Sequence, residues 1–151
     1  VAYRTALGIV RDPALAADVT QDAYVAAYRQ RDRFRGEAPS AAWLHRIVVN
    51  QALGALRRRR RVQKVTDLTP LMVPDAAPGT ASQLSLLAAL DVLPARHRAA
   101  VVLRYYHDYD YATLARILGT STTNVGAMLS RSLDRLRGAL DRAEGAMEGV
   151  R

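Results

Sequence analysis

The chain has 151 residues, of which 22 are basic and 14 acidic, and its formal net charge at pH 7 is +8. Half of the residues are hydrophobic and only 6% are aromatic, a composition that can bury a core and that favours packed helices over sheets. Because there is no cysteine, disulfides, thiolate zinc sites and a cysteine nucleophile are excluded. No apolar run approaches the roughly 20 residues of a membrane span and no signal peptide is visible, so we expect a soluble, cytoplasmic protein.

The positive charge is unevenly distributed along the chain. Residues 1–65 carry 13 basic and 5 acidic residues, whereas residues 84–151 carry 9 and 7. A basic excess confined to one half indicates a polyanionic partner such as nucleic acid. A membrane surface is the weaker alternative, because the basic segment lacks a strongly hydrophobic opposite face.

The first two predicted helices meet at Asp12-Pro13. Residues 1–10 have the pattern of the end of a helix. Asp12 is a good N-cap for the next helix, because Pro13 can occupy its first position without losing a hydrogen bond. This second helix runs to about Arg31. Its apolar face at helical spacing consists of Leu15, Val19, Ala23, Ala26 and Ala27.

A charged loop separates this pair from a long helix. The loop runs from Gln30 to Ser40, and Ser40 is a favourable N-cap for a helix that continues to about Arg61. Its inward positions are Leu44, Val48, Ala52 and Leu56. Residues 66–83 then contain three prolines and no basic residue, which is typical of a flexible linker that leaves two helical units free to move.

Four helices are predicted after the linker. The first begins near Leu84 and ends before Pro94, and the second carries an apolar stripe of Ala99, Val102, Leu103 and Tyr106. Asp110 caps the third, which ends at Gly119, and Ser121 caps the fourth. The inward positions of the fourth are Val125, Leu129, Leu133, Leu136 and Leu140. Because strand signals are almost absent, we expect an all-α fold of two small helical domains joined by a flexible linker.

The segment from Tyr111 to Ser130 has the spacing of a helix-turn-helix. Ala115 is a small residue where two steeply crossing helices would approach, and Gly119 tolerates the positive φ of the turn. Further inward positions are Leu114, Leu118, Val125 and Met128. The pattern predicts that the second helix enters a major groove, although an ordinary helical hairpin with a glycine C-cap has the same spacing.

The long helix of the first half has a polar, basic face, made of Arg46, Asn50, Leu53 and Arg57. Five consecutive arginines follow from position 57. A basic helix end is favourable by itself, but five arginines exceed that need, so phosphate contact is favoured. In the preceding loop, Arg33, Phe34 and Arg35 suit unstacked bases of single-stranded nucleic acid. An equal alternative places Phe34 in the small core.

The helix before that loop carries a mixed acidic and amide stripe, made of Asp18, Gln21, Asp22 and Val25. Such a stripe is usually a solvated face, but in a basic half it could meet a basic protein partner. No enzyme is expected. The three histidines, His45, His97 and His107, lack metal-ligand spacing, and no glycine-rich phosphate loop or nucleophile elbow is present. No metal or cofactor is therefore expected either.

Taken in order, these segments resemble the extracytoplasmic-function sigma factors of bacterial RNA polymerase. The matching stretches cover nearly the whole chain apart from the linker: Ala17–Tyr24, Phe34–Gly36, Trp43–Asn50 leading into the arginines, Leu93–Arg98, and the helix-turn-helix through Arg131. The resemblance implies a transcription initiation factor that joins core RNA polymerase, recognises promoter DNA and melts it.

The resemblance also implies a division of labour. Residues 1–65, expected to be truncated at the N-terminus, would bind the polymerase clamp and read the minus-ten element, and residues 84–151 would read the minus-thirty-five element as duplex. Polymerase contacts would come from Asp18, Gln21, Asp22 and Val25. DNA contacts would come from Arg33, Phe34, Arg35, Arg46, Asn50, Arg57, Arg58, Thr122, Thr123, Asn124, Ala127, Ser130 and Arg131.

Core RNA polymerase and promoter DNA are thus the expected partners. An anti-sigma factor is a possible third partner. Insertion into a membrane is not expected. The alternative is a free-standing helix-turn-helix repressor whose first domain binds a ligand or dimerises. That alternative requires a ligand-sized apolar pocket and a long dimerisation helix, and the sequence alone indicates neither.

Overall fold

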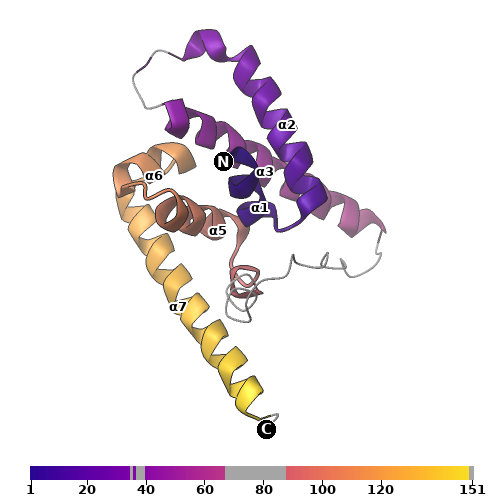
Figure 1. Cartoon of the computed structure of the whole chain (residues 1–151), viewed down its shortest axis with the longest axis vertical. Coiled ribbons are helices and arrows are strands. Elements are labelled where there is room, and N and C mark those ends of the chain that lie inside the picture. Colours follow the sequence, from indigo (N-terminus) through magenta and orange to yellow (C-terminus); the bar gives the residue numbers. More distant parts are fainter. Residues whose placement is uncertain (35, 37–39, 67–87, 150–151) are drawn as a thin grey trace.

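The computed structural model describes residues 1–34, 36, 40–66 and 88–149. Every regular element in these ranges is helical (Figure 1), so the predicted all-α class is confirmed. The predicted linker, residues 66–83, lies outside the described residues except for Thr66. Within the described ranges, no helix is both long and apolar enough to cross a membrane.

The first helical unit contains α1 (Ala2–Val10), α2 (Pro13–Arg29), the short 3-10 helix η1 (Arg31–Arg33) and α3 (Ser40–Thr66). The predicted cap is present at Asp12, whose carboxylate accepts hydrogen bonds from the amides of Ala14 and Leu15. α3 extends five residues beyond the predicted end at Arg61. Gln63 and Lys64 within this extension are good helix formers.

The buried positions of α2 and α3 differ from those predicted, and α3 buries more of its surface than one stripe. Val19, Ala23, Val48 and Ala52 are buried as expected, but the predicted inward residues at the edges of the stripes are only half-buried: Leu15, Ala26, Ala27, Leu44 and Leu56. Buried positions that the periodicity did not single out are Ala16, Ile47, Val49 and Ala55. α3 buries a second flank because it contacts α1 and α2 on one side and α5 and α6 on the other.

The second helical unit contains α5 (Ala95–Val101), the π-helical turn η2 (Val102–Tyr106), α6 (Tyr111–Leu118) and α7 (Thr122–Glu148). The structure describes residues 88–93 of the predicted helix before Pro94, of which 88–90 are helical and 91–93 form a turn, so the helix ends earlier than predicted. Both predicted caps are confirmed: Asp110 accepts from the Thr113 amide at 2.8 Å and Ser121 from the Asn124 amide at 3.1 Å.

Two predicted inward residues of this unit are exposed instead. Tyr106 is 54% exposed, because the wider π turn changes the register of the helix after Val102. Leu133 is 39% exposed, because it lines an open groove together with Tyr105 and Tyr106. In the rest of its stripe Val125, Leu129 and Leu136 are buried as predicted, whereas Leu140 is half-buried. α7 itself is long and runs past the other helices of its unit (Figure 1).

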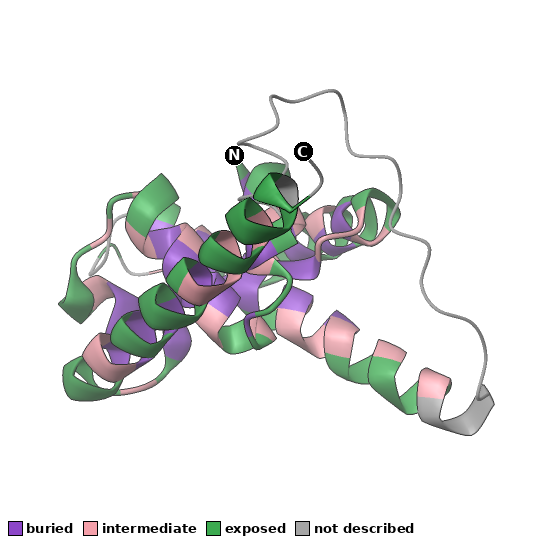
Figure 2. Ribbon diagram, turned by 90° about the horizontal axis from the view of Figure 1, so that it is seen from below, coloured by how far each residue is buried: buried purple, intermediate pink, exposed green. Residues whose placement is uncertain are grey.

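The two units pack against each other through α1, α3, α5, α6 and η2. Buried positions gather in the middle of the molecule, and residues 56–63 of α3 are exposed or half-buried (Figure 2). At Gly8 the backbone of α1 approaches η2 so closely that a Cβ would lie 2.9 Å from Val102 Cγ2. The sequence predicts two mobile halves, whereas the structure joins them by a continuous core.

A buried arginine connects the units. Arg98 of α5 is only 9% exposed, and its Nε donates to the Ile9 carbonyl at the end of α1 at 2.7 Å. The same guanidinium donates to the Leu93 carbonyl. Nearby, Arg11 forms a 3.0 Å ion pair with Asp91 of the second unit. Burial lowers the pKa of Arg98 from its ordinary value, and the two carbonyls provide the acceptors that a buried guanidinium needs.

Candidate nucleic-acid interface

The helix-turn-helix is present with its predicted key residues in place. Ala115 is buried, Val125 is fully buried, and Gly119 is the C-cap of α6 with a φ of 65°. This left-handed conformation strains other residues and is natural for glycine. The turn places the start of α7 at the surface, where a helix can enter a major groove.

The outer face of α7 carries the predicted duplex contacts. Five of the six are exposed, namely Thr122, Thr123, Asn124, Ser130 and Arg131, while Ala127 is half-buried. The hydroxyl and amide groups can exchange hydrogen bonds with base edges. Asn124 is held in position, because its Nδ2 donates to Thr120 Oγ1 at 2.7 Å. Arg131 is the only charged residue from Thr122 to Ser132, so this face has little phosphate attraction of its own.

On α3, Arg46 and Asn50 lie exposed one turn apart, beside a cavity of about 320 Å³. The cavity is lined by Gln30, Trp43, Arg46, Ile47, Asn50 and Gln51. An aromatic ring, side-chain amides and a guanidinium are the groups that hold an unpaired base by stacking and hydrogen bonds. Sequence reasoning missed Gln30, Trp43 and Gln51 as members of this site. A signal was available for two of them, since Trp43 is the sole tryptophan and Gln51 adjoins Asn50.

The position of Phe34 combines features of the two alternatives that the sequence leaves open, which are stacking on unpaired bases and burial in the small core. Phe34 is half-buried, and its ring packs on Trp43 with the ring centroids 5.2 Å apart. It therefore packs against Trp43, which lines the cavity, and remains partly exposed. Arg33 is exposed. Arg35, also predicted to contact DNA, lies outside the described residues.

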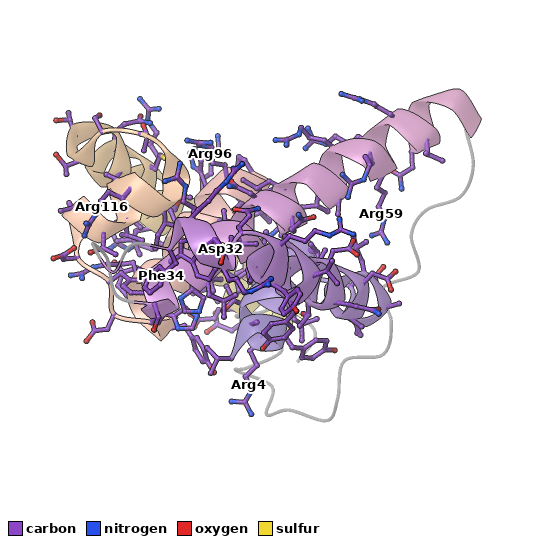
Figure 3. The ribbon with its side chains drawn as sticks, turned by 90° about the horizontal axis from the view of Figure 1, so that it is seen from above. Arg4, Asp32, Phe34, Arg59, Arg96 and Arg116 are labelled. Carbon is purple, nitrogen blue, oxygen red and sulfur yellow. The ribbon has the colours of Figure 1, made fainter. Side chains whose placement is uncertain are left out.

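The basic run of α3 divides into one structural arginine and several exposed ones. Arg59 pairs with Asp12 at 2.7 Å and ties α3 to the start of α2 (Figure 3). The hydrogen bond from Arg59 lowers the pKa of Asp12 below its ordinary value. The predicted contacts Arg57 and Arg58 are exposed. A phosphate backbone can therefore reach them without breaking a contact that holds the fold.

The predicted polymerase-binding stripe lies along one face of α2. Asp18, Gln21, Asp22 and Val25 are all exposed, and neither carboxylate has an ion pair within the described ranges. Tyr24 and Tyr28 beside them are 53% and 68% exposed. Tyrosine is enriched at protein interfaces, and exposed carboxylates complement a basic partner.

The structure thus gives three separate surfaces rather than one site: the α2 stripe, the α3 face with its cavity, and the outer face of α7. On α3, Arg57 lies about 16 Å along the helix from Arg46, at 1.5 Å per residue. No group of three or more potential metal ligands is found in the described part of the chain.

An apolar groove was not foreseen from the sequence. It has a volume of about 470 Å³ and crosses both units, from Gly8 on α1 to Tyr105 and Tyr106 on η2 and Leu133 on α7. Together with the length of α7, it supplies the two features that the repressor alternative requires. These features are therefore not what separates the two functions.

Comparisons with known proteins distinguish between these two candidate functions. The family model described as Sigma-70 region 2 matches residues 1–62, and the model described as Sigma-70, region 4 matches residues 83–136. The ECF RNA polymerase sigma factor SigM of Mycobacterium tuberculosis strain H37Rv is 37% identical over 80% of this chain and 62% of its own length. The RNA polymerase sigma-E factor of Streptomyces antibioticus is 31% identical over 91% of this chain and 77% of its own length. The chain therefore spans about three fifths of the first relative and three quarters of the second.

A solved structure has the same fold. It is the co-crystal structure of the sigma factor RpoE with the anti-sigma factor NepR from Bartonella quintana. Its TM-score is 0.80 at 24% identity, and the match covers 93% of this chain and 89% of that one. The match extends over both helical units, so the fold as a whole, and not only that of one unit, has a counterpart among solved structures.

Proposed function

This chain belongs to the extracytoplasmic-function sigma factors of bacterial RNA polymerase, and we propose on this basis that it directs core polymerase to promoters and opens their DNA. The observation that supports this most is the presence of three separate exposed surfaces on one chain: the α2 stripe, the α3 face and the outer face of α7. A factor that binds polymerase, unpaired bases and duplex DNA at once needs three such surfaces. A repressor needs only one of them.

In this proposal residues 1–65 bind the polymerase clamp and the minus-ten element. Asp18, Gln21, Asp22 and Val25 contact the clamp. Arg46 and Asn50 line the base-sized cavity, which receives a base released from the melted strand. Phe34 supports it by packing on Trp43. Arg33, Arg57 and Arg58 hold the neighbouring phosphates.

Residues 84–151 read the minus-thirty-five element through α7. The contacting residues are Thr122, Thr123, Asn124, Ala127, Ser130 and Arg131. These residues position the protein on the duplex and read its bases, and none of them has a catalytic role. The protein therefore acts as a non-enzymatic initiation factor. Its place of action is the cytoplasm. An anti-sigma factor is a further candidate partner, as NepR is for the structural relative.

Charge reversal on the α2 stripe tests the polymerase contact. We expect the Asp18→Lys/Asp22→Lys variant to lose at least about 100-fold in affinity for core polymerase, because each charge-assisted contact contributes roughly 1.5–3 kcal/mol. Immobilised chain and purified core enzyme give this affinity directly. Circular dichroism checks that helicity is unchanged.

The matched control reverses two exposed aspartates on α7, in Asp134→Lys/Asp141→Lys. It changes the net charge of the chain equally and should bind core polymerase like the original. Unchanged binding by the α2 variant, or equal loss in the control, would show that the stripe does not contact polymerase.

A further inference from the structure

A cluster of polar rings lies between the two helical units. His45 of α3 and Tyr109, between η2 and α6, approach to 2.6 Å from Nδ1 to Oη. His107, in the same segment as Tyr109, lies 2.6 Å from Thr5 Oγ1 of α1 through its Nε2. The two imidazoles are in contact, with ring centroids 4.1 Å apart. Each histidine thus forms its hydrogen bond across the boundary between the units.

Both imidazoles are held in their neutral form. His45 is only 3% exposed, and burial, together with the adjacent His107, lowers its pKa to about 4. Burial also lowers the pKa of His107. The groups that face the pair are Tyr109, whose own pKa burial raises, Thr5, and Tyr106, whose ring centroid lies 4.8 Å from that of His107. No carboxylate among the described residues forms an ion pair with either ring.

We propose that His45 and His107 form a proton-sensitive latch, which holds the two helical units together while both imidazoles are neutral and releases them when protonated. In the closed form both imidazoles are buried and in contact with each other. A positive charge on either ring is then desolvated, and positive charges on both rings repel each other. Opening returns both rings to water, where an imidazolium is stable.

The direction of the pH dependence follows from this difference. In the open form a histidine titrates near its ordinary pKa of about 6.5, whereas in the closed form His45 titrates at about 4. The closed form is therefore fully favoured above pH 6.5 and loses its advantage as the pH falls towards 4. For His45 alone, the ratio of open to closed molecules rises on the order of 30-fold between pH 7.5 and pH 5. His107 adds in the same direction.

The other polar contacts between the units are made by arginines rather than histidines. Arg98 donates to the carbonyls of Ile9 and Leu93, Arg11 pairs with Asp91, and Arg4 donates to the Tyr106 hydroxyl. The third histidine, His97, lies within the second unit, and the charges nearest to it are Arg135, Arg131 and Arg96 of that unit. The response at the boundary therefore belongs to His45 and His107.

Opening of the latch has a consequence for the proposed function. Only this consequence, and not the latch itself, rests on the proposed function. Promoter elements centred about 25 base pairs apart are separated by roughly 85 Å of duplex at 3.4 Å per base pair. Two units packed on one core cannot reach both elements together. Release of the latch therefore gives the form that can span a promoter, and mild acidification favours it.

The absence of cysteine from the chain makes a direct measurement simple. Arg29→Cys on α2 and Arg137→Cys on α7, both at exposed positions, place one dye on each unit. Single-molecule energy transfer then counts closed and open molecules at pH 7.5 and pH 5. We expect the open-to-closed ratio to rise at least tenfold at pH 5 with helicity unchanged by circular dichroism. An unchanged ratio, or a loss of helicity at pH 5, would overturn the proposal.

Variants identify the responsible groups. His45→Asn keeps a polar atom near Nδ1 and His107→Gln keeps one near Nε2, and neither replacement titrates, so the labelled double variant should show less than a twofold change in the ratio. His97→Gln is the matched control and should respond like the parent. If the double variant does not reach parental helicity, the single His107→Gln variant should show a reduced but measurable response. A full response in the double or the single variant, or its loss in the control, would contradict the latch.

Binding of core polymerase to the labelled chain separates the latch from the proposed function. If energy transfer shows opening at pH 5 but core polymerase fails to bind at any pH, the latch stands and the proposed function fails. If polymerase binds and the ratio is independent of pH, the reverse holds.

Discussion

At the scale of single residues, Gly8 sets how closely the two units approach. A Cβ at this position would lie 2.9 Å from Val102 Cγ2, and valine in a helix has one strongly preferred rotamer. Gly54 is a matched glycine in α3, where a Cβ meets only the ends of two arginines, the nearer at 3.4 Å. Both substitutions to alanine gain the same helix propensity, so their difference isolates the contact between the units.

We expect Gly8→Ala to be less stable than Gly54→Ala by about 1–3 kcal/mol, the usual range for overpacking a well-packed site. The free energy of unfolding from urea titration of each full-length variant measures the difference. Equal stabilities would mean that α1 and η2 are not in close contact in solution.

Local chemistry is what the sequence predicted best at this scale. Asp12, Asp110 and Ser121 were recognised as caps because a cap depends on residues two or three positions away. The contact of His45 with His107 was not foreseen, because the spacing of the histidines was compared only with metal-ligand patterns. Nothing local records that contact, since it exists only after α3 of one unit packs against the segment before α6 of the other.

At the scale of elements, the turn between α6 and α7 decides how the duplex-binding face is presented. Gly119 has a φ of 65° and an added Cβ would meet no atom within 4 Å, so a substitution there is opposed by backbone strain alone. We expect Gly119→Ala to destabilise the turn by about 1–2 kcal/mol. The polymerase complex containing it should lose affinity for duplex carrying a minus-thirty-five element, measured by fluorescence anisotropy.

The control at the same position is Gly119→Asn, because asparagine enters the left-handed region more readily than other side chains. It should retain most of the duplex affinity that the alanine variant loses. Equal losses in both variants would mean that the glycine is needed for contact with DNA rather than for its conformation.

At this scale, periodicity and caps predicted the kind and order of the helices, but they did not predict which residues of each helix are buried. Tyr106 was assigned inward on the assumption of a regular α-helix, and the π turn at Val102–Tyr106 invalidates that register. The stripe of α3 was read as narrow because periodicity assumes one covered side, while α3 is covered on two. Of the candidate site, the exposed faces of α2, α3 and α7 were predictable. The cavity beside Trp43 was not, because Gln30 enters it from another element.

At the scale of the whole molecule, the composition of residues 66–83 predicted mobile halves and the described units are packed together. Linker composition governs the stiffness of a segment, but it carries no information on whether the domains it joins attract each other. The attraction comes from Gly8, Arg98, His45 and their partners, and each of these contacts is long-range in the sequence.

This closed arrangement determines how the free chain should behave with DNA. The outer face of α7 has Arg131 as its only cation from Thr122 to Ser132, and the α3 face suits unpaired bases rather than a closed groove. Neither surface alone provides strong attraction to duplex, and in the closed form the two cannot engage separate promoter elements. Core polymerase that holds the units apart would convert two weak contacts into one strong one.

A mobility-shift titration at physiological salt tests this central claim most directly. Promoter duplex selected by the assembled polymerase and a scrambled duplex are each titrated with the chain alone and with the chain bound to core enzyme. We predict weak, unselective binding by the chain alone and clear preference for the promoter only with core enzyme. Tight, sequence-selective binding by the free chain would contradict the account and support a free-standing repressor.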